Sequence, residues 1–206
     1  MNTPAALQNV IAKTDCADVV QRWAFYRDQK RWQDLQDIFT SDGEIHVCWY
    51  KGSATGFVEH LRSRDQARAG MAKHHIFPSV VDVSGTRALA ETSAVIMVRQ
   101  MIGDILVDLN SKGRFLDRLE KHNGKWLIRE RIAVYEQDRM DPVEPSEAFD
   151  RLLQEADTSI YPVAYRYMGF RVAAAGGQLV EPVITDDCRE LLAIKTRFAS
   201  WLHSSE

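Results

Sequence analysis

The sequence contains no apolar run near the roughly 20 residues that a membrane-spanning helix needs. Its first residues also lack the basic start and following apolar segment of a secretory signal. Cysteine is scarce: Cys16, Cys48 and Cys188 are too few and too widely spaced for a disulfide framework or a zinc site. We therefore expect a cytoplasmic protein with reduced thiols, no membrane contact and no bound metal.

The chain also lacks an excess of positive charge. Its 206 residues include 26 Lys and Arg against 29 Asp and Glu, which gives a formal net charge of -3. Proteins that bind nucleic acid usually present a basic face, so we expect no nucleic-acid partner. With 45% hydrophobic residues, the chain can form one domain with a sizeable core plus an appendage, or two small domains.

Helical periodicity dominates the first third of the chain, and strand patterns follow it. Turn-forming residues at 41–43 separate the first helices from the first strand. This order predicts an α+β fold in which helices pack on one face of an antiparallel sheet. The predicted helices cover residues 15–31, 33–39 and 57–71, and the predicted strands cover 44–50, 74–83, 87–101, 105–121 and 125–138, with a bulge near 110–113.

The strand region ends at residues 141–145, because this segment contains two prolines and proline cannot continue a sheet ladder. Three apolar helical segments follow, the first capped by Ser146 and the second over residues 161–175. They are too apolar to stand alone in water, so they must cover the core or a partner subunit. We predict a pocket domain over residues 1–142 and a C-terminal helical extension over residues 143–206.

Adjacent histidines, His74 and His75, open a β-branched run. Read as one strand, this run places His75 on the same side as Phe77 and Val81, and His74 on the other side. Histidine exchanges protons near neutrality, so the inward-facing one could be a catalytic base or a hydrogen-bonded core residue. Asp28 lies at the edge of the buried face of the first helix, where a carboxylate is either solvated or part of a site.

Several short motifs occur in a characteristic order around the two histidines. They are YRDQKRW at 26–32, LQDIFTSDG at 35–43, GRFLD at 113–117 and NGKWLIRER at 123–131. In this order and spacing, the chain resembles the SnoaL-like branch of the nuclear-transport-factor-2-like superfamily over roughly residues 15–141. The resemblance implies a cone-shaped, cystatin-like fold, in which a curved antiparallel sheet wraps around N-terminal helices and leaves a deep apolar pocket.

The resemblance also implies a site. Enzymes of this superfamily, such as scytalone dehydratase and hexachlorocyclohexane dehydrochlorinase, use an Asp–His pair in the pocket. By motif, the aspartate falls on Asp28, the histidine on His75 and a pocket arginine on Arg131. His74 is then an outward-facing bystander. Arg131 has the opposite parity to Trp126 in the last strand, so a bulge or a different facing is needed to bring it inward.

A pair of this kind predicts a specific chemistry. Neutral His75 would abstract a proton, and Asp28 would orient the imidazole and stabilise the imidazolium. Arg131 would counter a developing negative charge. This predicts a lyase or isomerase, dehydratase-like, that needs neither metal nor cofactor and acts on a small hydrophobic molecule. The predicted apolar walls of the pocket are Ile45, Val47, Trp49, Phe77, Val81 and Phe115.

Two alternatives to an enzyme stay open at this point. One is a pocket protein that binds a small ligand without catalysis, with His75 only orienting the ligand. The other is a subunit-interaction module of the same fold, in which the helical extension docks on a partner. Because sheets of this fold often pair, we expect a homodimer or a homotrimer.

Overall fold

The computed structural model describes residues 4–66 and 71–204 and shows one strongly curved seven-stranded sheet with helices on both of its faces. The sheet order is β2-β1-β7-β6-β5-β3, and β4 also pairs with β5. All neighbouring strands are antiparallel except β1 and β7, which run parallel. The predicted α+β fold class is confirmed. The strands are β1 (Phe39–Val47), β2 (Tyr50–Ser53), β3 (Met71–Ile76), β4 (Val80–Ser84), β5 (Arg87–Ile102), β6 (Ile105–His122) and β7 (Lys125–Pro142).

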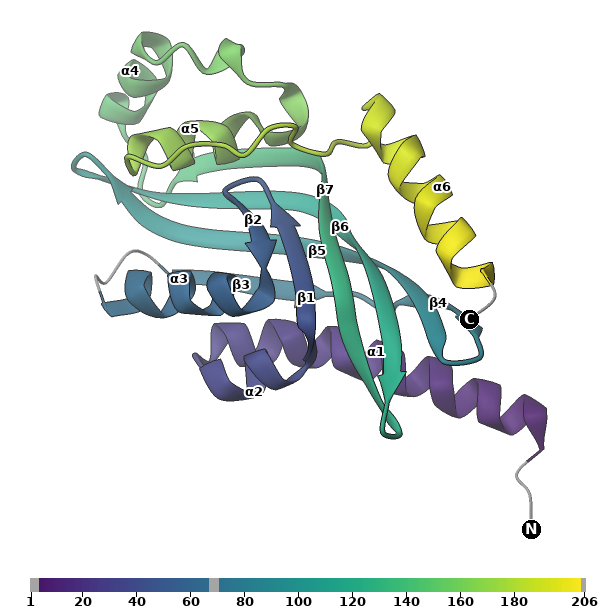
Figure 1. Ribbon diagram of the computed structural model, residues 1–206. Helices are drawn as coiled ribbons and strands as arrows, with labels where there is room; N and C mark the ends of the chain where they lie inside the picture. The colour runs from purple at the N-terminus through teal and green to yellow at the C-terminus, as the bar shows by residue number, and fades with distance from the viewer. Residues whose placement is uncertain (1–3, 67–70, 205–206) are drawn as a thin grey trace.

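The N-terminal helices lie against the concave face of the sheet (Figure 1). They are α1 (Ala5–Asp28), α2 (Trp32–Asp37) and α3 (Ala54–Gln66). Helix α1 begins ten residues before the predicted start, because its first turns carry exposed apolar residues and so no amphipathic stripe marks them. The predicted end of α3 falls on residues 67–70, which lie outside the described part of the chain.

The predicted strand over residues 74–83 is wrong, because two strands occupy it. Segment Phe77–Ser79 separates β3 from β4, although both strands pair with β5. Ile76 pairs with Ala94 and Val80 pairs with Glu91, so β3–β4 has one residue more than β5 over this stretch. One extra residue reverses the alternation of side chains. Counting alternate residues back from β4 therefore assigns the side chains of β3 to the wrong face of the sheet.

Two bulges in β7 reverse its side-chain alternation in the same way. The pairing with β6 shifts at Arg129 and again at Glu136. The predicted irregularity in β6 coincides with the second shift, where a Cβ atom on Gly113 would lie 2.1 Å from the carbonyl oxygen of Val134. A side chain is therefore excluded at this point of the sheet. The turn predicted at residues 41–43 instead lies inside β1, whose pairing with β7 shifts register there.

The C-terminal extension divides between two places on the sheet (Figure 1). Helices α4 (Glu147–Glu155) and α5 (Arg166–Ala174), with the 3-10 turns Thr158–Ile160 and Val163–Tyr165, lie at one end of the sheet beside β7. The predicted cap is confirmed, since Ser146 Oγ accepts a hydrogen bond from the Phe149 amide at 3.3 Å. The second predicted helix is wrong in its start, because Pro162 and the short turn Val163–Tyr165 delay it to α5.

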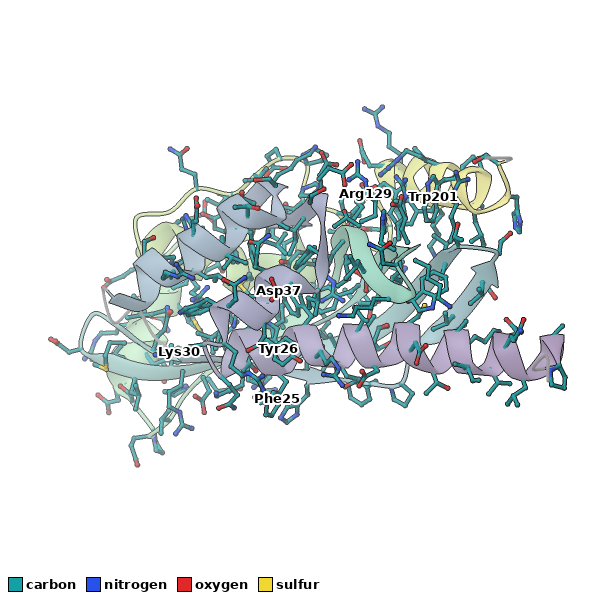
Figure 2. All side chains as sticks on the ribbon, turned by 60° about the horizontal axis from the view of Figure 1, so that its bottom comes forward. Phe25, Tyr26, Lys30, Asp37, Arg129 and Trp201 are labelled. Atoms are coloured by element: carbon teal, nitrogen blue, oxygen red, sulfur yellow. The ribbon has the colours of Figure 1, made fainter. Side chains whose placement is uncertain are left out.

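Helix α6 (Arg189–His203) covers the convex face of β6 and β7. Its Phe198 packs there in a second, smaller core with Leu116 and Ile132. Figure 2 shows Trp201 of this helix on the side of the molecule away from α1. Both faces of the sheet are therefore covered. No helix in the described ranges is long and apolar enough to cross a membrane.

Candidate active site

A cavity of about 190 Å³ opens between the concave face of the sheet and helices α1, α3 and α5. It is larger than the roughly 150 Å³ that accommodates benzene in an apolar protein interior. Aromatic rings form one side, where Trp49 stacks on Phe57 at 5.4 Å between ring centroids. Trp23 continues this wall and meets Phe115 edge to face at 5.2 Å. An aromatic or alicyclic ring is a suitable occupant for such walls.

Asp28 and His74 meet at this cavity. Asp28 is the last residue of α1, and β3 passes beside that helix end. One carboxylate oxygen of Asp28 accepts a hydrogen bond from the His74 backbone amide at 2.6 Å. The other lies 2.8 Å from His74 Nδ1. Two contacts from one residue fix the carboxylate against both the strand and the ring.

The contact with Asp28 sets the tautomer of the His74 ring. An ionised carboxylate can only accept, so Nδ1 carries the proton and donates it to Asp28. Arg27 Nη1 lies 3.4 Å from the same ring nitrogen, which makes that approach a charge contact and not a hydrogen bond. Nε2 is left as the acceptor of the ring. The ring is held in place by Trp23, whose plane it meets edge to face at 5.3 Å.

The electrostatics of the pair keep the histidine neutral. Burial, and then the positive charge of Arg27, lower the pKa of His74 to about 4. Burial alone would raise the pKa of the Asp28 carboxyl, but the hydrogen bonds from His74 and the charge of Arg27 outweigh it and lower that pKa. At neutral pH the pair is therefore an imidazole held by a carboxylate. This is the ionisation state that a general base needs.

A model of the SnoaL-like domain matches residues 8–132, which is more than half of the chain. The chain belongs to the SnoaL-like domain family. Pea pathogenicity protein 2 from Fusarium vanettenii is 29% identical over 78% of this chain and 69% of its own length. A PEP2-like protein from the same fungus is 25% identical over 82% of this chain and 72% of its own length.

Solved structures share the fold of this SnoaL-like chain at low sequence identity. A putative scytalone dehydratase from Novosphingobium aromaticivorans is 16% identical, with a TM-score of 0.56 over 68% of this chain and 97% of its own. A hexachlorocyclohexane dehydrochlorinase, LinA type 2, is 13% identical, with a TM-score of 0.57 over 69% of this chain and 95% of its own. These likenesses support the predicted cone-shaped, cystatin-like architecture.

The histidine that contacts Asp28 at the cavity is His74, and the inward placement predicted for His75 is wrong. His75 is exposed on the opposite side of β3, and Phe77, predicted to share its inward side, is 50% exposed. The side chain of His74 is only 4% exposed. The parity of the two histidines was read from Val81 and carried back across residues 77–79, where the extra residue reverses it.

Arg131 points to the concave side of the sheet, as the resemblance predicts, because the bulge at Arg129 reverses the alternation. It does not line the cavity, however. Its guanidinium is completely buried and donates to both carboxylate oxygens of Asp117, at 2.6 and 2.7 Å. It also lies 4.4 Å from the ring centroids of Trp23 and Phe115. Its position supports the aromatic wall, and the role predicted for it against a developing negative charge has no support from the cavity lining.

The predicted apolar walls are placed as follows. Val47, Trp49 and Phe115 line the cavity. Ile45 and Val81 are buried in the main core but do not line it.

Sequence reasoning missed several residues that line the cavity. Tyr135 lies between the two bulges of β7, and the reversal at Arg129 points it inward, where its hydroxyl oxygen accepts a hydrogen bond from the Cys48 amide at 3.1 Å. Arg27, Arg64 and Arg171 also line it. Arg27 had a local signal, because it directly precedes Asp28. Arg171 had none, since it comes from the C-terminal extension beyond the SnoaL-like match.

In the described part of the chain, no group of three or more His, Cys, Asp or Glu side chains is arranged to hold a metal ion. The cysteines that the structure describes are free, with Cys16 and Cys48 buried. Burial raises the pKa of the Cys48 thiol to about 11, so this thiol is not an activated nucleophile. The chemistry that these residues can perform is that of the Asp28–His74 pair.

Proposed function

We propose that this SnoaL-like protein is a lyase or isomerase that needs no cofactor, with His74 as the base that removes a proton from a ring-shaped, largely apolar substrate. The observation that carries the proposal is the 2.8 Å contact between His74 Nδ1 and Asp28 inside the aromatic-walled cavity. This contact leaves Nε2 as the proton acceptor. A well-placed general base contributes roughly 10²–10⁴-fold to a rate.

The proposed step begins when Nε2 of His74 takes a proton from a substrate carbon. In an elimination, the electron pair of that C–H bond expels a leaving group on the next carbon. In an isomerisation, it shifts a double bond that the substrate already contains. The imidazolium that forms is stabilised by Asp28, already hydrogen-bonded to the other ring nitrogen. The proton then goes to the departing group, or returns to another carbon in an isomerisation.

Tyr135 lines the same cavity and is suited to assist the reaction. Burial raises the pKa of its hydroxyl well above the ordinary value, so the group keeps its proton. Its oxygen accepts from the Cys48 amide, and its hydroxyl, which also hydrogen-bonds with the Cys48 thiol, can donate instead to a leaving group or a carbonyl oxygen. A base and a donor in one cavity fit both elimination and a proton shift.

The fold neighbours support this reaction class. They include a putative scytalone dehydratase and a hexachlorocyclohexane dehydrochlorinase, whose names describe loss of water and of hydrogen chloride. The curated relatives share more sequence, but neither name identifies a reaction. The substrate class of the present chain is therefore argued from the cavity alone.

The test is solvent deuterium uptake. The protein is incubated in D₂O with a panel of hydroxylated, halogenated and keto-substituted cyclic compounds, and mass spectrometry follows deuterium uptake and elimination products. We expect His74→Gln to reduce turnover by roughly 10²–10⁴-fold. His75→Gln is the matched control, because His75 is the next residue in the strand and is exposed.

An unchanged rate in His74→Gln, or an equal loss in His75→Gln, would contradict the proposal. Binding of panel compounds with no deuterium uptake and no product would favour the alternative of a ligand-binding protein. In that case the Asp28–His74 pair would only orient the ligand.

A further inference from the structure

Three arginines from different parts of the chain converge on the cavity. Arg27 comes from α1, Arg64 from α3 and Arg171 from α5. Their charges are close enough to act on one another, since Arg27 and Arg64 both lower the pKa of Arg171. A purely apolar substrate would gain nothing from such a cluster.

Acidic partners for these arginines are scarce. Among the described residues that line the cavity, Asp28 is the one carboxylate, and it is already bonded to His74. Arg27 shares it at 3.2 Å. Arg171 donates to the neutral Gln100 Oε1 at 2.8 Å. Lys30 and Lys73 also line the cavity, so five cationic side chains against one carboxylate leave an excess of four positive charges around it.

Arg64 is the least neutralised of the three. Its guanidinium lies 5.6 Å from the ring centroid of Trp49, and it makes no ion pair within the part of the chain that the structure describes. Trp49 is also in the aromatic wall of the cavity. Positive charge and an apolar surface for a ring therefore occur side by side.

Keeping like charges together in a partly buried place has a cost. Burial, and then the charge of Arg64, lower the pKa of Arg171 to about 10, and burial lowers that of Arg27. Both shifts mean that burial in the cavity wall and the neighbouring arginines disfavour these positive charges. An anion bound among them would relieve this repulsion and would form charge-assisted hydrogen bonds with the guanidinium groups.

We propose that the substrate carries a carboxylate on an apolar ring, and that Arg27, Arg64 and Arg171 bind this carboxylate while the ring packs on Trp49 and Phe57. This inference rests on the proposed function and names the substrate class of that site. The carboxylate is an anchor remote from the reacting carbon. Its binding energy positions the C–H bond at Nε2 of His74.

The inference also gives the C-terminal extension a part in specificity. Arg171 and Met168 line the cavity from α5, beyond residues 8–132 of the SnoaL-like match. The SnoaL-like core supplies the Asp28–His74 pair, and the extension supplies one of the three charges that select the substrate.

The test compares benzoate with benzamide, which has nearly the same shape and no charge, and with phenyl phosphate. Binding to the full chain is followed by NMR titration of the indole N–H signals, since Trp23, Trp32 and Trp49 line the cavity. We expect benzoate to bind at least about tenfold more tightly than benzamide, as expected of charge-assisted contacts. Arg171→Met should lower the affinity for benzoate about tenfold and leave the affinity for benzamide unchanged. Arg171→Lys should restore part of the lost affinity for benzoate.

Arg139→Met is the matched control, because Arg139 is an exposed arginine of β7 paired with Asp141. This variant should bind every ligand with the affinity of the wild type. Equal affinity for benzoate and benzamide in the wild type, no binding of benzoate at millimolar concentration, or an equal loss of both ligands in Arg171→Met would each overturn the inference. Clearly tighter binding of phenyl phosphate than of benzoate would overturn the choice of a carboxylate and make a phosphate monoester the anionic group.

The two proposals fail in different ways. Suppose that benzoate binds selectively, also in His74→Gln, but the wild type turns over no cyclic carboxylate. The anion site would then stand and the enzyme proposal would be refuted. If neutral cyclic compounds are turned over in a reaction that requires His74, while benzoate and benzamide bind equally well, the enzyme proposal stands and the anion site is refuted.

Discussion

The pH dependence of stability offers a quantitative test of the environment of His74. The pKa of this residue falls from the ordinary value of 6.5 to about 4 in the folded protein. The unfolded chain therefore binds more protons than the folded one between these two values, so stability rises with pH across this window. In the acid direction, the folded state is progressively weakened as the pH drops below 6.5.

The size of the effect follows from the two pKa values. A single group with these values makes unfolding easier by about 2 kcal/mol on going from about pH 7 to about pH 5. The assay is urea unfolding of the wild type and of His74→Gln at both pH values, followed by tryptophan fluorescence. The difference between the two proteins reports the titration of His74, together with the change that losing the ring imposes on Asp28.

We expect the wild type to lose about 2 kcal/mol more than His74→Gln between these conditions. Equal losses in the two proteins would mean that His74 titrates alike in the folded and unfolded states. That result would refute the reasoning, because a histidine with an unshifted pKa is neither buried against Arg27 nor kept neutral by its surroundings.

Three further predictions concern the residues around the site. Arg131→Met should lower the free energy of unfolding by about 3–5 kcal/mol, measured by urea titration, because it leaves the carboxylate of Asp117 buried without its partner. Gly113→Ala should cost about 1–3 kcal/mol in the same assay, because the new methyl group would collide with the carbonyl oxygen of Val134. Asp28→Asn should lower turnover by about 10²–10⁴-fold while circular dichroism stays unchanged, because an amide no longer fixes the ring tautomer of its histidine partner.

The order of elements and the family motifs were sufficient to predict the fold. Long alternating segments and the Asn123–Gly124 hairpin placed the strands β5 to β7 to within a few residues. The start of α1 was missed, because exposed Leu7 and Val10 give its first turns no amphipathic pattern. Local sequence carries no signal for a helix face that no other element covers.

The site was predicted only in part, and bulges explain the difference. Asp28 was placed correctly at the end of α1, beside a histidine of β3. Strand parity continued across Pro78 favours His75 over His74, but one extra residue at this point reverses the two sides. For Arg131 the predicted need for a bulge was right, although the pairing with Asp117 across β6 was not foreseen. Cross-strand pairing depends on register, which periodicity alone does not determine.

The arginines of the cavity show a second reason why the sequence alone does not predict the whole site. Arg171 lies more than a hundred residues from Arg27 and Arg64 in sequence, and nothing in its own segment predicts that α5 reaches the cavity. The position of the extension depends on tertiary contacts such as the hydrogen bond from the Met168 amide to Asp138 at 2.7 Å. Long-range packing of this kind has no periodic signature.

The central claim is that His74 is a neutral base held in one tautomer by Asp28. Nitrogen-15 NMR of the protein labelled at histidine tests it most directly, because the shifts of the two ring nitrogens report both the tautomer and the pKa. The account predicts a protonated Nδ1, an unprotonated Nε2 and a pKa for His74 near 4. A proton on Nε2 at neutral pH, or titration of His74 near its ordinary pKa of 6.5, would contradict it.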